Sequence, residues 1–290
     1  MSNITQVTFY PNEIQYYGFN HSTQPSISGQ DFTSSGGETT GALYDLLDNR
    51  RSARVQINTN GETVAADITI VPTANISSCN FAIIDNHNLK SADAKIYIND
   101  EYSASLVSII NSKSGTLGSA MSADSVTTGI ITISANGTTL INIAATNFTT
   151  NGWTLDIDDV NIFDANVLLG EFAAGKSFTP SVNPEYGEAF EFGYANDGLS
   201  LYTNKSGRRF VSHFHSERRF WKLDFNCVTE SELAEFRRIF QITRGYPLYV
   251  SFDSDSNTPT VYRVRIVNSY NAIPIAAGLY EVVVEMEEEL

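Results

Sequence analysis

The chain of 290 residues contains no run of 18 consecutive apolar residues, so the sequence predicts no membrane-spanning helix. Its opening residues, MSNITQVTFYPNEIQYYG, include neither a basic segment nor a long apolar one, and we expect no secretory signal peptide. Cysteine occurs only twice, at Cys79 and Cys227, which lie far apart in the sequence. Because free cysteine behaves as a small hydrophobic residue, we expect both to be buried, reduced thiols.

Positive charge is also scarce, since 18 Lys and Arg stand against 33 Asp and Glu, for a net charge of −15. A nucleic-acid-binding surface has to neutralise phosphates, so we expect no nucleic-acid partner. Nine of the 18 basic residues nevertheless lie between Lys205 and Arg244. We expect this basic region to contact an acidic protein surface or to pair internally, and the acidic end at 285–289 to be solvated.

Sequence motifs of common catalytic sites are missing as well. There is no glycine-rich phosphate loop and no HExxH, GxSxG or CxxC. Asp156, Asp158 and Asp159 lie close together in the sequence, and in a glycan-cleaving enzyme such carboxylates would need a defined separation in space. That enzyme is an alternative hypothesis; we expect no enzymatic activity and no cofactor.

Three alternating residues resemble part of a metal site. His213, His215 and Glu217 would share one face of a strand, and two histidines with a carboxylate are able to ligate a transition metal. Arg218 and Arg219 follow directly, and the sequence offers no further ligand cluster. We therefore expect a polar or partner-facing strand surface and no metal.

A second incomplete pattern resembles a calcium-binding loop. Asp253, Asp255 and Asn257 match the first three alternating ligands of such a loop. Thr258 stands where the loop requires glycine, and Val264 stands where it requires a bidentate glutamate. We expect a polar hairpin loop here.

Period-two patterns dominate residues 43–170. Asn-Gly pairs, which tolerate the positive φ of tight hairpin turns, begin at Asn60, Asn136 and Asn151. Predicted strands lie at 54–58, 66–71, 80–85, 94–99, 129–134, 139–145 and 153–158, and within 160–170. Many short strands at this spacing, without helical patterns, predict a β-sandwich.

Two segments show little regular pattern. Residues 1–42 are predicted to form an extended N-terminal arm with an early aromatic cluster, which is either disordered or laid along a partner. Residues 171–198 are predicted to be an aromatic-rich connection that packs against another surface.

Residues 199–290 are predicted to form an antiparallel β domain with one packed α-helix, beginning with a hairpin. Thr229 and Glu232 have the spacing of a capping box, which predicts a helix over residues 229–244. Gly245 and Pro247 predict where it ends. The fold class is therefore mainly β.

Residues 43–170 resemble galactose-binding-like (discoidin-type) jelly-roll domains, including versions found in phage structural proteins. The resemblance is carried by LYDLLD, RSARVQI, NFAIIDNHNLKSADAKIYI, GWTLDIDDVNI and VLLGEF. It includes a turn between two core strands that contains Asn86, His87 and Asn88, and it implies that these residues are candidates for contact with a sugar or a partner. Alternatively, their side chains bond the backbone of the turn itself.

Residues 199–290 resemble tail-tip proteins of tailed bacteriophages, in which a strand and a helix precede an arginine–glycine turn and an aromatic strand. In this chain the turn contains Phe240, Arg244 and Gly245, and the strand contains Tyr249, Phe252 and Asp253. The chain differs from the usual layout of that family because a sandwich precedes the tail-like domain.

The resemblance implies a structural virion protein of the distal tail or baseplate, made in the host cytoplasm. Its partners would be itself, in a ring-like homo-oligomer, and other phage tail proteins. The candidate assembly contacts are Tyr16, Tyr17, Phe19, Arg208, Arg209, Arg218 and Arg219. The alternative is a carbohydrate-binding adhesin that recognises a glycan on the host surface.

Overall fold

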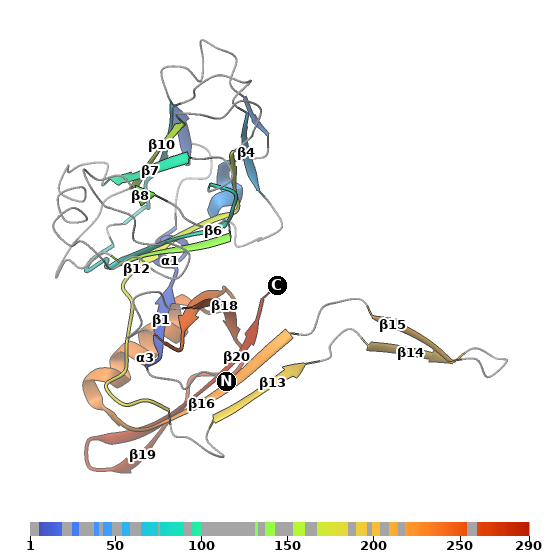
Figure 1. Ribbon diagram of the computed structural model, residues 1–290. Helices are drawn as coiled ribbons and strands as arrows, with labels where there is room; N and C mark the ends of the chain where they lie inside the picture. Colours follow the sequence, from blue (N-terminus) through green and yellow to red (C-terminus); the bar gives the residue numbers. More distant parts are fainter. Residues whose placement is uncertain are drawn as a thin grey trace. The chain divides into compact units, whose positions relative to one another are not determined.

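The computed structural model describes residues 6–18, 25–28, 38–40, 43–47, 54–58, 65–74, 76–89, 94–99, 131–132, 137–142, 153–159, 167–184, 190–195, 199–203, 209–213, 218–253 and 260–289. Within them the fold is mainly β, with antiparallel sheets and one long α-helix, which confirms the predicted fold class (Figure 1). The galactose-binding-like topology stays a prediction.

The chain divides into two compact units. The first comprises Met1–Thr179 with Ser251–Val261, and the second comprises Pro180–Val250 with Tyr262–Leu290. Each unit is therefore built from segments that are not contiguous in the sequence.

The largest sheet of the first unit has five strands and is centred on β10. Its order is β2 (Ser26–Ser28), β5 (Ala65–Ile70), β10 (Trp153–Asp159), β7 (Ala94–Asn99) and β8 (Ile131–Thr132). Leu155 of β10 lies opposite Ile68 and Ile98, and both Leu155 and Ile68 are buried. The period-two pattern of the sequence thus places its apolar residues in the core.

Two three-stranded sheets complete this unit. One has the order β11 (Val167–Leu169), β4 (Val55–Asn58) and β3 (Glu38–Thr40), and the other has the order β12 (Glu171–Gly175), β6 (Phe81–His87) and β9 (Gly137–Asn142). A 3₁₀ helix, η1 (Leu43–Leu47), buries Leu46 and Leu47. Fully buried side chains such as Phe81 and Phe172 form the core between these elements.

Residues 6–18 differ from the extended arm expected over residues 1–42. They form β1 (Thr8–Pro11) and α1 (Glu13–Tyr17), and most of them are buried. Phe9 and Phe178 exchange two backbone hydrogen bonds of 2.9 Å, each N–H donating to the other carbonyl. The sequence indicates only a short possible strand at Val7 and Phe9, because the partner of this segment lies far along the chain.

Five strands of the second unit follow one another in a single sheet. The order is β17 (Leu248–Ser251), β18 (Val261–Ile266), β20 (Leu279–Glu288), β16 (Arg218–Thr229) and β13 (Phe190–Ala195), and β19 (Ala272–Ala276) also pairs with β20. Trp221, Leu223 and Phe225 of β16 are buried in alternation, as the sequence predicts. Their face of the sheet forms the core of this unit.

The predicted helix is confirmed as α3 (Glu230–Ile242). Thr229 caps it, and the reciprocal capping box with Glu232 is present. Gly245 has a φ of 84°, a conformation that glycine adopts readily, and the helix has already ended there. The ring of Phe236 lies 5.1 Å from that of Phe225, which joins the helix to β16.

Two strands lie within residues 171–198, where the sequence predicts a connection with little regular structure. β12 pairs with β6, and β13 pairs with β16. All five residues of β12 are buried, so this strand has no polar face and shows no alternation. A period-two search therefore fails to detect it.

The predicted hairpin after residue 198 is confirmed. β14 (Leu199–Thr203) and β15 (Arg209–His213) pair antiparallel, with Leu201 opposite Val211 and Tyr202 opposite Phe210. The hairpin is inserted between β13 and β16 and forms a two-stranded sheet of its own.

The two cysteines lie in different environments. Cys79 is fully buried, as predicted, but Cys227 is exposed, so the prediction of two buried thiols is wrong for Cys227. The register between β16 and β20 shifts between Phe225 and Val228, and Cys227 has a φ of 66°. This bulge breaks the alternation and turns Cys227 outward.

Candidate functional site

The candidate sugar-contacting residues lie in a bulge inside β6, although the sequence predicts a turn between two strands. The register between β6 and β9 shifts between Ile84 and His87, and Asn86 has a φ of 53°. A bulge of this kind re-aims side chains without ending the strand. β6 consequently continues through His87.

His87 is held by two hydrogen bonds and is only 4% exposed. The backbone N–H of Leu89 donates to its Nδ1 at 3.3 Å, which leaves the ring proton on Nε2. That Nε2 lies 2.8 Å from the hydroxyl oxygen of Thr139 and donates to it. Burial lowers the pKa of His87 to about 4, although the nearby Asp85 carboxylate acts in the opposite direction.

Asn88 and Asp85, on the two sides of His87 in the sequence, also form hydrogen bonds with the backbone and side chains around β6. The Asn88 side-chain oxygen accepts a hydrogen bond of 2.7 Å from the backbone N–H of Leu168 in β11. The buried Asp85 carboxylate accepts from the backbone of Asn86 at 2.8 Å and from the Thr138 hydroxyl of β9.

Asn86 completes this network. Its side-chain oxygen accepts from the Arg54 guanidinium. A Cβ added at Gly170 would lie 2.7 Å from the Asn86 Cβ, so the two backbones approach closely only because glycine is present. The polar side chains of the bulge thus join β6 to its neighbours, which supports the alternative that they stabilise the fold. Sugar contact by these residues stays a prediction.

The candidate assembly residues are placed only in part. Tyr16 is 51% exposed and packs edge-to-face on Tyr17 with 5.4 Å between ring centroids. The Arg219 guanidinium lies 5.1 Å from the ring centroid of Tyr262, and its Nε lies 3.5 Å from a Glu288 carboxylate oxygen. Phe19, Arg208 and the side chain of Arg209 lie outside the described residues, and Arg218 is half-buried.

The C-terminal acidic residues are paired within the second unit and are not simply solvated as the sequence predicts. Glu289 accepts from the Nη1 of the buried Arg263 at 2.6 Å and also pairs with Arg265. Together with the pairing of Glu288, these contacts hold the end of β20 against β16 and β18. Arg219, which belongs to the basic region between Lys205 and Arg244, therefore forms an ion pair within the chain.

The residues of the incomplete metal and catalytic patterns do not form a site within the described part of the chain. The Asp253 carboxylate accepts from the Thr260 backbone at 2.9 Å and from the Ser251 hydroxyl at 3.0 Å. Among described residues no group of three His, Cys, Asp or Glu is able to hold a metal ion. Residues 215, 217, 255 and 257, and the side chains of His213 and of the three β10 aspartates, lie outside the described positions.

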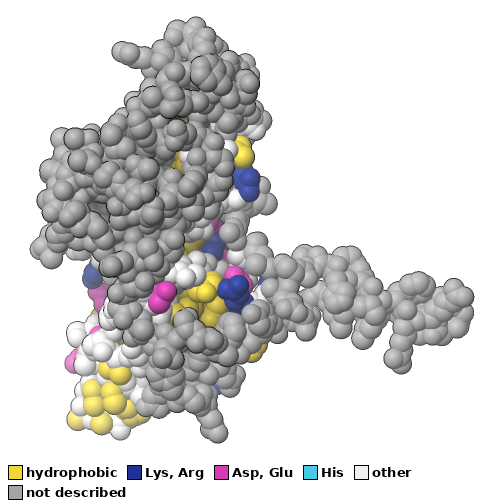
Figure 2. Space-filling model, viewed as in Figure 1, with side chains coloured by type: hydrophobic (Ala, Val, Ile, Leu, Met, Phe, Trp, Pro, Cys, Tyr) yellow, Lys and Arg dark blue, Asp and Glu magenta, His cyan; other side chains and the backbone are white. Residues whose placement is uncertain are grey.

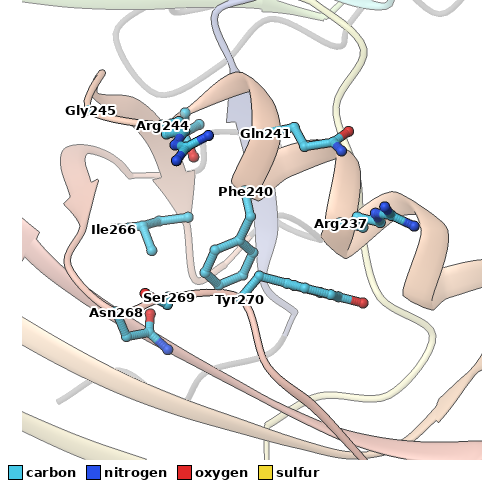
Figure 3. A pocket seen from close by; sticks show the side chains of 10 residues that line it. Arg237, Phe240, Gln241, Arg244, Gly245, Ile266, Asn268, Ser269 and Tyr270 are labelled. Carbon is cyan, nitrogen blue, oxygen red and sulfur yellow. The ribbon is translucent and has the colours of Figure 1, made fainter.

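The sequence did not predict the pocket that lies beside α3. A cavity of about 370 Å³ is lined mainly by the last two turns of α3 and by residues 266–270 (Figure 3). The Tyr270 ring packs on Phe240 with 5.4 Å between centroids, and its hydroxyl donates to the Leu233 carbonyl at 3.4 Å. Burial raises the pKa of Tyr270, which Arg237 opposes.

Exposed apolar side chains gather on β19 and next to β18. Ile273, Ile275 and Val267 are 46%, 45% and 50% exposed. Figure 2 shows hydrophobic side chains grouped at the end of the second unit where Figure 1 draws β19. We call Val267, Ile273 and Ile275 the apolar edge.

Comparison with known proteins adds no relative. No known family, no curated protein and no solved structure matches the chain. In the described residues there is no helix long and apolar enough to cross a membrane.

Proposed function

We propose that this chain is a structural virion protein of the distal tail or baseplate of a tailed bacteriophage, where it self-associates and contacts other tail proteins. The phage assignment is based on the sequence resemblance of residues 199–290 to tail-tip proteins. The self-association is based on the apolar edge, which is the observation that carries the proposal.

The apolar edge has the character of a protein contact surface. Ile273 and Ile275 flank Pro274 on a strand at the margin of the sheet, where large side chains remain about half exposed. Contiguous exposed apolar surface marks protein–protein contacts in soluble proteins. Because proline has no N–H, Pro274 restricts pairing with a further strand, so we expect contact through the side chains.

The β14–β15 hairpin gives independent support. An isolated two-stranded hairpin is marginally stable in water and usually requires a third strand or another packing surface. No other described strand pairs with this hairpin. A neighbouring subunit would supply the surface, as in an assembled ring.

Sedimentation velocity of the purified chain tests the self-association. We expect wild-type protein to form species larger than the 31.9 kDa monomer, and Ile273→Asp/Ile275→Asp to shift the equilibrium toward the monomer. Burying charge at this surface without a partner is unfavourable, and we expect dissociation to increase at least about tenfold. Val182→Asp, at an apolar residue that is 37% exposed elsewhere, is the matched control. A wild-type chain that stays monomeric at high concentration contradicts the proposal.

A further inference from the structure

A continuous groove runs along one side of α3. Two cavities, of about 370 and 440 Å³, share the lining residues Arg237, Gln241 and Tyr270. Their linings extend from Glu230 at the start of the helix to Arg244 just beyond its end. At 1.5 Å per residue this distance is about 20 Å, the length of roughly six residues of extended chain. We call it the α3 groove.

The groove carries positive charge that the described part of the chain does not neutralise. Arg237 and Arg244 are exposed, and neither has an ion-pair partner among described residues. Their neighbour Arg238, by contrast, pairs with Glu235 at 2.8 Å. The two unpaired guanidinium groups are therefore available to bind carboxylates.

Between the two arginines the groove is aromatic. Figure 3 shows Phe240 and Tyr270 packed together, with Arg244 on one side of them and Arg237 on the other. Gln241 is exposed on the same side of the helix and supplies an amide donor and acceptor. The groove thus combines an apolar centre with flanking cations.

The spacing of the arginines limits which ligand fits. Arg244 lies seven positions after Arg237 and just beyond the end of α3, about 10 Å further along the direction of the helix. In an extended peptide successive side chains alternate between faces, so carboxylates on one face are separated by about 7 Å at two residues or about 13 Å at four. At the four-residue spacing, one further side chain lies between the two carboxylates on the same face of the peptide.

We propose that the α3 groove binds an extended acidic peptide segment of another protein, with two carboxylates four residues apart, on one face of the segment, meeting Arg237 and Arg244. An apolar side chain between those carboxylates lies on Phe240 and Tyr270. The inference rests on the proposed assembly function, which requires partner proteins, and it specifies what kind of segment such a partner presents.

The charge of the chain favours a different protein over a second copy. Each copy carries a net charge of −15, so two copies repel each other at long range. In the second unit, Glu235, Glu288 and Glu289 are already paired with arginines of the same chain. An acidic segment on another protein meets the groove without displacing these pairs.

Fluorescence anisotropy with the full chain tests this inference directly. The probe is acetyl-Gly-Glu-Ala-Phe-Ala-Glu-Gly-amide carrying a rhodamine label, and its control has Gln in place of both Glu residues. We expect saturable binding of the probe that weakens as salt is raised, and at least about tenfold weaker binding of the control. Arg237→Glu/Arg244→Glu should also reduce affinity at least about tenfold.

Two further variants separate groove contacts from net charge. Arg237→Lys/Arg244→Lys keeps the charge, and we expect it to retain binding within roughly fivefold, the loss reflecting the bidentate geometry of arginine. Lys176→Glu reverses a charge in the first unit, and we expect less than about a twofold effect. Circular dichroism checks that α3 is intact, since both arginines are exposed.

The inference is overturned if the wild-type chain does not bind the probe, or if the Gln control or the double-reversal variant binds equally well. It is also overturned if Arg237→Glu/Arg244→Glu abolishes self-association in sedimentation, because the occupant would then be a second copy. Self-association without probe binding removes only this inference, whereas probe binding by a strictly monomeric chain removes the self-association proposed above.

Discussion

At the scale of single residues, the Asn-His-Asn sequence at the end of β6 is explained by the strands around it. The left-handed backbone of Asn86 and the close approach of Gly170 require particular residues, and the side chains of His87 and Asn88 satisfy backbone and hydroxyl groups of neighbouring segments. Such a sequence resembles a binding motif because binding and backbone satisfaction use the same polar side chains. Only the positions of the groups that hydrogen-bond with these side chains distinguish a binding motif from one that stabilises the fold.

His87 should make the first unit less stable in acid. Its pKa is about 4 in the folded protein and about 6.5 when unfolded, so the unfolded state binds more protons between these values. The free energy of unfolding should therefore fall as pH drops from about 6.5 to 4, by roughly 2 to 3 kcal/mol from this residue. Urea unfolding at pH 7.5 and 4.5 measures the effect.

His87→Gln is the comparison for that experiment, because glutamine keeps a side-chain donor and acceptor but does not titrate. We expect the variant to lose a substantial part of the stability difference between pH 7.5 and 4.5. An unchanged pH dependence would mean that His87 is not the titrating group.

At the scale of elements, α3 could be predicted almost completely from the sequence, because its start and end depend on local chemistry. The capping box and the glycine beyond the helix act over a few residues. What the sequence did not indicate is that Glu232 also accepts a hydrogen bond of 2.7 Å from the backbone of Ser181. The start of the helix thereby anchors the segment that opens the second unit.

Glu232→Ala should lower the stability of the second unit by about 1 kcal/mol, because it removes the capping box and the Ser181 contact. Glu230→Ala is the matched control, since it removes an acidic residue from the same turn and so an equal dipole interaction. Thermal unfolding of both variants measures the difference. Equal losses would show that charge alone matters.

The stabilisation that Glu232 provides at the start of α3 should depend on pH in a defined direction. Burial raises the pKa of Glu232, but hydrogen bonds from Ser181 and Thr229 outweigh it and lower the pKa to about 2. The stabilisation is therefore present above the unfolded pKa of 4.5 and is lost as pH falls toward 2. The wild-type advantage over Glu232→Ala should shrink across this window.

At the scale of the whole molecule, how well an element could be predicted depends on how far apart in the sequence its interacting residues lie. Strands with one buried face, such as β10 and β16, were predicted because alternation is visible in the sequence. β12, buried on both faces, was not predicted, and β1, held by a distant partner, was expected only as a short possible strand within an extended arm. The α3 groove was not predicted, because Tyr270 is distant from α3 in the sequence and belongs to a segment that shows no pattern of its own.

The arginines of the second unit fall into two groups that differ in whether they form ion pairs within the chain. Arg219, Arg238 and Arg263 are used to hold the fold together, whereas Arg237 and Arg244 are left exposed beside aromatic rings. A sequence count of basic residues does not separate these groups, because pairing depends on strand register. The division is consistent with the proposed binding of an acidic partner segment beside α3.

We propose that this chain is a building unit of a phage tail. A map from electron cryo-microscopy of particles that carry the chain tests it most directly. We predict several copies arranged as a ring at the distal end of the tail, with the apolar edge of each copy covered by a neighbour. Particles in which the chain lies outside the tail, or in which the apolar edge faces solvent in every copy, would contradict the account.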